Sequence, residues 1–309
     1  MLSAGKNQSQ CAKMLGMYRS SIKREVEGNR DPDGVYRGVH ADKRAMGRRR
    51  TAKEPKRKIE NDRKLRRHIV RKLKRFWSPE QIAGRLNRIC GRGVICHETI
   101  YVFIYEKRPD LVRYLRRQKN KYRKKRGSWA RILSNKASKI RRINEREDIV
   151  ETKVRVGDWE GDTIVGKEKT QRILTYVERK SGLAMADKLD LVTAEIVLHK
   201  TAERFNSLPK EARITLTRDN GVEFGDLDTD LEEKTRLLVY RATPYHSWER
   251  GANENWNGLL RQFFPKGTYF ANITQYQVDQ AVRSINNRPR KRLGYRTPRE
   301  VFNECCNSS

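Results

Sequence analysis

Residues 155–166 read RVGDWEGDTIVG, and the alternation of apolar and polar side chains in this stretch predicts a β-strand. Trp159 falls on one face of the strand, and Asp158, Glu160 and Asp162 fall on the other. Three carboxylates on one face repel one another unless a cation lies among them. The stretch therefore predicts either a cation site or the solvated outer face of an edge strand.

The segments that follow extend this strand into an α/β domain. RILTYVERKSG at 172–182 and LAMADKLDL at 183–191 are strand-like runs with a tight turn between them, so the first three strands form an antiparallel meander. Residues 193–205 have helical periodicity. ITLTRDNG then predicts a fourth strand that ends at Asp219, which the pattern alone equally allows to be a simple turn residue.

A third acid follows in HSWERGANENWNGLLRQFFPKG, residues 246–267. The large apolar residues recur at i, i+3, i+4, i+7 and i+8 from Trp256, and they predict a helix with one buried stripe that Pro265 and Gly267 end. The opposite side carries a narrow polar face of four residues: Glu254, Asn257, Gly258 and Arg261. That face fits a ligand site or an ordinary amphipathic helix. Together, the strand acid, the strand-end acid and the helix acid favour a site where three carboxylates hold two Mg²⁺ ions about 3.5–4 Å apart.

The charge of the chain is unevenly distributed. Lys and Arg number 70 against 38 Asp and Glu, which gives a formal net charge of +32 at pH 7. Residues 1–150 hold 44 Lys and Arg against 15 acids, or +29, and residues 151–309 hold the remaining +3. An excess of this size favours a polyanionic partner, with nucleic acid as the first candidate.

Two exclusions follow from composition. No run of 18 apolar residues and no apolar signal-peptide core is present, which predicts an intracellular protein that does not contact a membrane. The five cysteines lack paired CxxC spacing, so they are predicted to be free thiols and not zinc ligands or disulfides.

Two short helical patterns in residues 8–27 are separated by Leu15-Gly16-Met17, with Ser20 or Ser21 placed to cap the second. They predict a helix-turn-helix unit, or else a surface helical hairpin. Its expected core is Cys11, Ala12, Leu15, Ile22 and Val26. Its expected DNA contacts, near the start of the second helix, are Arg19, Ser21, Lys23 and Arg24.

A second helix-turn-helix unit is predicted after Ser78-Pro79, where serine caps a helix and proline takes its first position. Ile100, Phe103 and Ile104 then recur at helical spacing, and His97 and Thr99 are its expected DNA contacts. The basic stretches GRRRTAKEPKRK and RRQKNKYRKKRG lack apolar periodicity and predict solvated linkers that neutralise phosphates.

Four strings in the sequence resemble one known family: WEGDTIVG, LTRDNGVEF, PYHSWERGANENWNGLLRQFFPKG and NNRPRKRLGYRTPREVF. They are similar to bacterial insertion-sequence transposases of the IS30 family, within the DDE transposase and integrase superfamily, and the match covers essentially the whole chain. The resemblance implies that Asp162, Asp219 and Glu254 are the catalytic, metal-binding triad. It implies contact with substrate phosphate for Arg261 and Asn257. Three rival acids rank lower: Asp158, Glu160 and Glu249.

The resemblance also implies a fold and an activity. The fold is α/β, with a ribonuclease-H-like catalytic domain, a five-stranded mixed sheet flanked by helices, preceded by all-α helix-turn-helix DNA-binding domains. The activity is that of a DNA transposase that binds the terminal inverted repeats of an insertion sequence and catalyses metal-dependent cleavage and strand transfer. Two Mg²⁺ ions are expected, for which Mn²⁺ can substitute. Expected partners are double-stranded DNA, as element ends and as target, and further copies of the chain in a synaptic complex in the bacterial cytoplasm, at the nucleoid.

Four domains are expected: 1–60, the first helix-turn-helix and a basic linker; 61–110, the second helix-turn-helix; 111–150, a basic linker; and 151–305, the catalytic domain. Two other functions stay open. With an inactive metal site, the chain would be a DNA-binding regulator of the element's own promoter. A nuclease acting on RNA–DNA hybrids shares the fold, but the major groove of an A-form duplex is too narrow for two helix-turn-helix readers.

Overall fold

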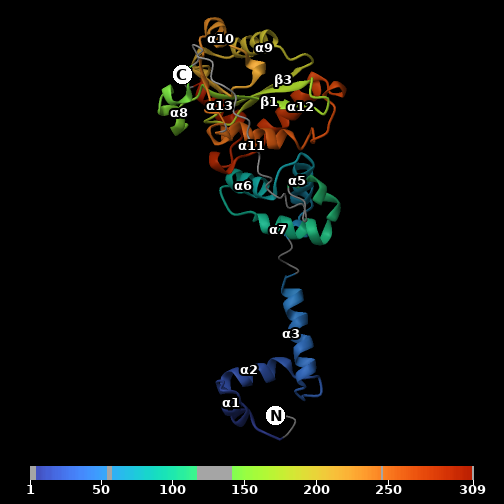
Figure 1. Cartoon of the computed structure of the whole chain (residues 1–309). Coiled ribbons are helices and arrows are strands. Elements are labelled where there is room, and N and C mark those ends of the chain that lie inside the picture. The colour runs from blue at the N-terminus through green and yellow to red at the C-terminus, as the bar shows by residue number, and fades with distance from the viewer. Residues whose placement is uncertain (1–4, 54–57, 117–140, 245, 308–309) are drawn as a thin grey trace. The chain divides into compact units, whose positions relative to one another are not determined.

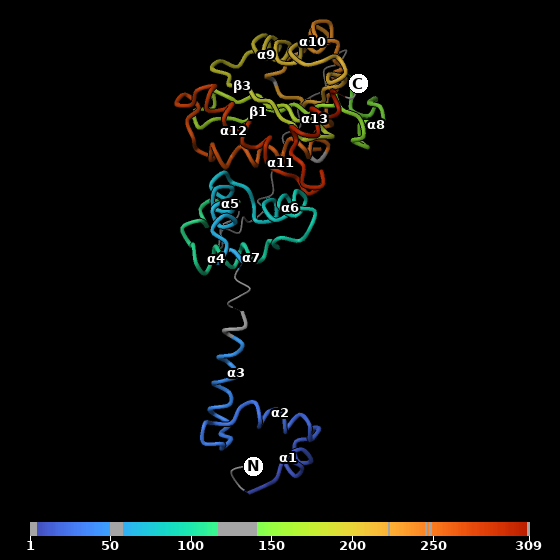
Figure 2. The backbone as a smooth tube through the Cα atoms, turned by 180° about the vertical axis from the view of Figure 1, so that it is seen from behind, coloured from blue at the N-terminus to red at the C-terminus, as the bar shows by residue number. Residues whose placement is uncertain are grey.

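The structure, a computed structural model, describes residues 5–53, 58–116, 141–244 and 246–307 (Figure 1). The chain divides into two compact units, Met1–Ile69 and Val70–Ser309, and the division falls within α5 (Arg63–Lys74). Figure 2 shows the same backbone from behind. None of the described helices is long and apolar enough to span a membrane.

The first unit is helical, with α1 (Gln8–Leu15), α2 (Arg19–Asn29), α3 (Gly38–Lys53) and α4 (Lys58–Asn61) ahead of α5. The helix pair predicted for residues 8–27 is confirmed. Four of its five expected core residues are buried together: Cys11, Ala12, Ile22 and Val26.

Two details predicted for this helix pair are wrong. Leu15 is 50% exposed, because it is the last residue of α1 and Gly16 follows it in the left-handed conformation, with φ at 63°. α2 begins at Arg19 with Tyr18 at its N-cap, so neither Ser20 nor Ser21 caps it.

The second unit begins with α6 (Pro79–Cys90), α7 (His97–Val102) and two short turns at Phe103–Lys107 and Pro109–Tyr114. The predicted cap of α6 is confirmed, because the Ser78 side chain accepts from the backbone of Gln81 and the Gln81 side chain accepts from Ser78. Ile100, Phe103 and Ile104 are buried, as their spacing predicts.

One five-stranded sheet forms the centre of the second unit. Its strands are β1 (Asp158–Val165), β2 (Arg172–Glu178), β3 (Ala184–Leu189), β4 (Thr215–Arg218) and β5 (Leu238–Arg241), in the order β3-β2-β1-β4-β5. β1, β2 and β3 are antiparallel neighbours, and β4 and β5 run parallel to β1. This mixed sheet with flanking helices is the predicted ribonuclease-H-like arrangement.

Helices cover both faces of the sheet (Figures 1 and 2). They are α8 (Ile149–Thr152), α9 (Ala194–Asn206), α10 (Asp228–Thr235), α11 (Gly251–Leu260), α12 (Gln275–Asn286) and α13 (Pro298–Asn307). One apolar cluster centres on Trp159, with Phe205 of α9 and Leu231 of α10. Another gathers Ile164 and Ile173 of the sheet with Trp256 of α11 and Val278 of α12. Short helical turns lie at 143–145, 210–212, 222–224, 247–250, 270–272 and 291–293.

The edge-strand interpretation of the acidic stretch is wrong. β1 is the central strand of the sheet, and Asp158 and Glu160 are each only 1% exposed. The helix with the third acid is also shorter than predicted, because α11 ends at Leu260 and the chain passes through a turn before Pro265. All five cysteines are free, as predicted.

Candidate active site

Two of the three predicted triad acids come together on the sheet: Asp162 lies on the central strand β1, and Asp219 directly follows the neighbouring strand β4. In the parallel pairing of β1 with β4, Glu160 lies opposite Thr217, so Asp162 and Asp219 follow two residues later on adjacent strands. Both carboxylates contact one guanidinium: Arg250 Nη1 is 3.4 Å from Asp162 Oδ1, and Arg250 Nη2 is 3.5 Å from Asp219 Oδ2. The two acids therefore share a single cation.

Asp162 is held in place by its neighbours. The Asn257 side chain of α11 donates to Asp162 Oδ2 at 2.8 Å, and the backbone N–H of Thr163 donates to Oδ1 at 2.9 Å. Burial raises the pKa of Asp162, the positive charge of Arg250 opposes that effect, and the negative charge of Asp219 adds to it. A buried carboxylate beside a second one is stabilised in its charged form by a cation.

α11 is fixed on the sheet by buried polar contacts. Asn253, fully buried, donates through its backbone N–H to Glu160 Oε2 at 2.9 Å and through its side chain to the Glu160 carbonyl at 3.0 Å. Thr175 of β2 lies 3.1 Å from the side-chain oxygens of both Asn253 and Asn257. These contacts set the position of Asn257 against Asp162.

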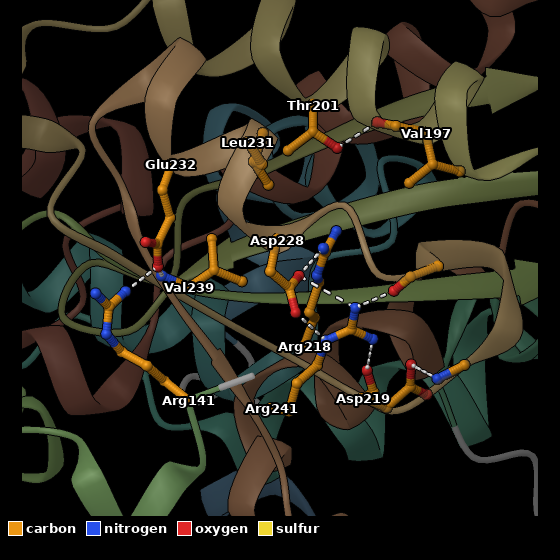
Figure 3. A network of polar contacts seen from close by, with 12 residues as sticks. Arg141, Val197, Thr201, Arg218, Asp219, Asp228, Leu231, Glu232, Val239 and Arg241 are labelled. Carbon is orange, nitrogen blue, oxygen red and sulfur yellow. Dashed lines mark hydrogen bonds and ion pairs between the residues drawn. The ribbon is translucent and has the colours of Figure 1, made fainter. Parts of the chain in front are cut away.

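Figure 3 shows how the segment after β4 is held. The Arg241 side chain donates to the Asp219 carbonyl at 3.0 Å, to the Gly225 carbonyl at 2.6 Å and to Asp228 Oδ2 at 2.7 Å. Arg218 pairs with the same Asp228 carboxylate, and all three charged side chains are buried. The network anchors the backbone at Asp219 to β5. Within that segment Asp219 Oδ1 also accepts from Gly221 N–H at 3.1 Å, so Asp219 is a turn residue as well.

Glu254 is not brought to the two aspartates. It is exposed in the first turn of α11, three residues before Asn257. Across the described parts of the chain, no three His, Cys, Asp or Glu side chains are grouped so as to hold a metal ion. The metal-binding triad of Asp162, Asp219 and Glu254 stays a prediction.

The rival acids have structural partners. Asp158 accepts from Arg155 at 2.9 Å and from Thr215 at 2.8 Å. Glu160 pairs with Arg179 at 3.1 Å, and burial raises its pKa. The third rival, Glu249, accepts from the backbone of Thr243 at 2.8 Å.

Other predicted contacts are placed as follows. Arg261 donates to the Val165 carbonyl at 2.9 Å, and burial lowers its pKa. The helix-turn-helix candidates lie on their helices, some exposed (Arg19, Lys23, Arg24 and His97) and some half-buried (Ser21 and Thr99). Lys23 pairs with Glu27 at 3.8 Å. Their contact with DNA stays a prediction.

Sequence reasoning missed Arg250, Arg241 and Arg218. Arg250 lies in the short turn 247–250 directly before α11, and the helical pattern of the sequence gave no sign of its contact with the aspartates. Arg241 carries none, because the fifth strand that holds it was not located in the sequence.

Comparison with known proteins decides the family. The chain is 38% identical to the transposase for insertion sequence element IS4351 of Bacteroides fragilis. The alignment of 312 positions spans all of this chain and 94% of the relative. The chain belongs to the IS30 family of insertion-sequence transposases. Within this family it is 35% identical to transposase InsI for insertion sequence element IS30A of Escherichia coli (strain K12), over 97% of the chain and 80% of the relative.

A more distant match to this IS30-family chain is the transposase for insertion sequence element IS1086 of Cupriavidus metallidurans, 32% identical over 94% of the chain and 87% of the relative. No family model matches. Among solved structures, the catalytic core domain of BIV integrase has a TM-score of 0.40 and 22% identity, over 49% of this chain and 96% of that one.

Proposed function

We propose that the chain is a DNA transposase that binds the terminal inverted repeats of its element and catalyses metal-dependent strand cleavage and strand transfer. The observation that carries the proposal is the convergence of Asp162 and Asp219, from adjacent parallel strands, on one cation. Relatives that span the whole chain are named as transposases, which supports the same reaction class.

The residues that would hold divalent metal are Asp162, Asp219 and Glu254. The aspartates fit Mg²⁺ or Mn²⁺, because both present carboxylate oxygens, the preferred ligands of hard cations, and both already contact a positive charge. Glu254 lies on the same helix as Asn257, which contacts Asp162. When bound, a metal pair supplies positive charge for the attacking and leaving oxygens of an in-line displacement at phosphorus.

The other residues of the site orient the two aspartates and neutralise their charge. Asn257 is a positioning residue, since it holds one oxygen of Asp162 and leaves Oδ1 directed to the shared cation. Arg241 positions Asp219 through its backbone carbonyl. Arg250 neutralises both carboxylates. Pre-positioned charged groups of this kind stabilise the charge that develops during phosphoryl transfer.

The uneven charge supports a division of labour. Residues 1–150, with a net charge of +29, would bind element ends through the two helix-turn-helix regions, and residues 151–305 would perform the chemistry. We expect several copies to assemble on paired ends, in the bacterial cytoplasm at the nucleoid.

The test is a cleavage and joining assay on labelled duplexes that carry the element ends, with Mg²⁺, with Mn²⁺ and without metal. Asp219→Asn should lower the nicking rate at least about a hundredfold, because it removes a charge that acts on the reacting centre, and leave end binding within about twofold. Asp230→Asn, at an exposed position of α10, is the matched control and should react like the wild type. Undiminished nicking by Asp219→Asn would refute the assignment.

A second candidate, a DNA-binding regulator without catalysis, is favoured by one observation: Glu254 lies apart from the two aspartates. The same assay separates the two. Specific end binding with no metal-dependent nicking by the wild type would establish the regulator.

A further inference from the structure

A cavity of about 420 Å³ opens beside the first turn of α11. Five cations line it: Lys153, Arg179, Arg290, Lys291 and Arg292. Its other lining residues are uncharged, among them Gly251 and Asn255 of α11 and Gly182 of the turn after β2. A cavity with cations and no acid on its wall favours an anion.

The larger cavity of the same unit shows the opposite pattern. It measures about 730 Å³, and its cations are compensated by acids on its own wall. Lys200 pairs with Glu203 at 3.0 Å, Lys188 pairs with Asp190, and Arg204 pairs with Asp187. In the cavity beside α11, Lys291 pairs with Glu80 at 3.1 Å, and Arg179 pairs with Glu151 and Glu160. Lys153, Arg290 and Arg292 have no ion pair within the described residues, so three cations of this wall are not balanced by an acid.

Arginines crowd around Arg290 without an acid among them. Burial, together with the positive charges of Arg292 and Arg116, lowers the pKa of Arg290 to about 10. Arg288, 1% exposed, has its pKa lowered to about 9 by burial, with Arg290 and Arg116 as further causes. Arg288 lies behind the cavity wall, where its guanidinium stacks on Phe76 and Phe263 and donates to Gln262 at 2.6 Å. Repulsion of this kind is relieved when an anion binds.

The cavity wall is held in shape. Arg292 Nη1 donates to the Lys180 carbonyl at 2.6 Å. Gly182, with φ at 71°, makes room for this arginine, since a Cβ there would lie 2.6 Å from Arg292 Nη2. Arg179 is 4% exposed, pairs with Glu151 and Glu160, and keeps an Nε–H without a hydrogen-bond partner in the described part of the chain.

We infer that this cavity binds backbone phosphates of a DNA strand that runs along α11. The unbalanced cations provide the attraction, and the amino-terminal turn of α11 at Gly251 adds the positive end of a ten-residue helix. The same helix carries Glu254 and Asn257. The bound phosphates therefore belong to the DNA strand that approaches Asp162 and Asp219. The inference rests on the proposed function for its substrate, DNA.

The test measures the salt dependence of DNA binding by the full chain. A fluorescein-labelled duplex of arbitrary sequence serves as the probe, because phosphate contacts carry no sequence information. Fluorescence anisotropy gives the binding constant at several salt concentrations. The logarithm of that constant falls with the logarithm of salt, with a slope of about 0.9 per neutralised phosphate. Lys153→Gln should reduce the slope by about 0.9, and Lys153→Gln with Arg290→Gln by about 1.8.

The matched control is Lys200→Gln, which removes one charge from the acid-balanced cavity and should leave the slope at the wild-type value. Lys153 is exposed, so its variant keeps the test valid even if Arg290→Gln fails to fold. The inference is overturned if Lys153→Gln keeps the wild-type slope, or if Lys200→Gln reduces the slope as much as Lys153→Gln does. Failure of the proposed function is seen separately, as wild-type protein that binds DNA but does not nick element ends.

Discussion

At the scale of single residues, the candidate site depends on side chains that position other side chains. Asn257 is half-buried, and its two polar atoms are both engaged, one with Asp162 and one with Thr175. Such partners of a metal-binding carboxylate fix its orientation, and their loss typically reduces metal affinity or activity by about 10–100-fold.

Asn257→Ala should therefore reduce the nicking rate by about 10–100-fold. The cause is the loss of the hydrogen bond that holds Asp162 Oδ2, so the thermal shift produced by Mn²⁺ should shrink in the same variant. Asn287→Ala is the control, since that asparagine is exposed and its side chain donates to the Arg283 carbonyl, away from the aspartates. Equal rates and equal Mn²⁺ shifts in wild type and Asn257→Ala would show that Asn257 does not position the acid.

The Asp228 carboxylate is a second case at this scale. It lies between the buried guanidiniums of Arg218 and Arg241, whose pKa values burial lowers to about 9 and about 10. Asp228→Asn leaves both buried charges without a counterion, so the free energy of unfolding should fall by about 3–5 kcal/mol in urea denaturation. Asp230→Asn, two residues on and exposed, should change it by less than about 0.5 kcal/mol. Equal midpoints for the two variants would contradict the network's role.

At the scale of elements, one acid joins two helices of the first unit. Asp31 follows α2 and contacts Arg37, directly before α3, at 2.6 Å, and His40 and Arg44 of α3, with His40 at 2.9 Å. These contacts hold the pKa of Asp31 well below its ordinary value of 3.8, with the Arg37 hydrogen bond as the largest cause. The carboxylate thereby fixes the turn between α2 and α3.

Asp31→Asn should speed amide hydrogen exchange across α2 and α3 at neutral pH. A carboxyl whose pKa is lowered by folding stabilises the fold above its ordinary pKa, and that stabilisation is lost as pH falls through the lowered value. The difference in opening free energy between wild type and variant should thus stay constant from neutral pH down to about pH 4 and shrink only in stronger acid. Asp33→Asn is the control, since its exposed carboxylate pairs with Arg37 and accepts from the Val35 backbone but does not contact His40 or Arg44 within the described residues. A difference that already disappears above the ordinary Asp range would oppose this account.

Elements also show what sequence patterns can predict. Alternation and strand-like composition predicted β1, β2, β3 and β4, but not that helices bury both faces of β2 and β4. The pattern did not locate β5, Leu238–Arg241, which holds the buried Arg241. Asp158 and Glu160 looked like solvent-facing or metal-binding acids because their partners, Arg155 and Arg179, meet them only in the folded sheet.

At the scale of the whole molecule, the charge is divided unevenly along one chain. Residues 1–150 carry nearly all of the net charge, and residues 151–309 carry the acids that meet on the sheet. The sequence predicted this division and the family, and it predicted the aspartate pair through its spacing and resemblance. It could not predict Arg250 between the aspartates, because that contact depends on where α11 packs against β1.

The central claim is that Asp162, Asp219 and Glu254 share divalent metal, and anomalous diffraction from Mn²⁺-soaked crystals tests it most directly. The account predicts anomalous peaks about 2.1 Å from carboxylate oxygens of all three residues, with Arg250 withdrawn from the position where it now contacts both aspartates. Absence of a peak at the aspartates, or a peak there with the Glu254 carboxylate still turned to solvent, would contradict it.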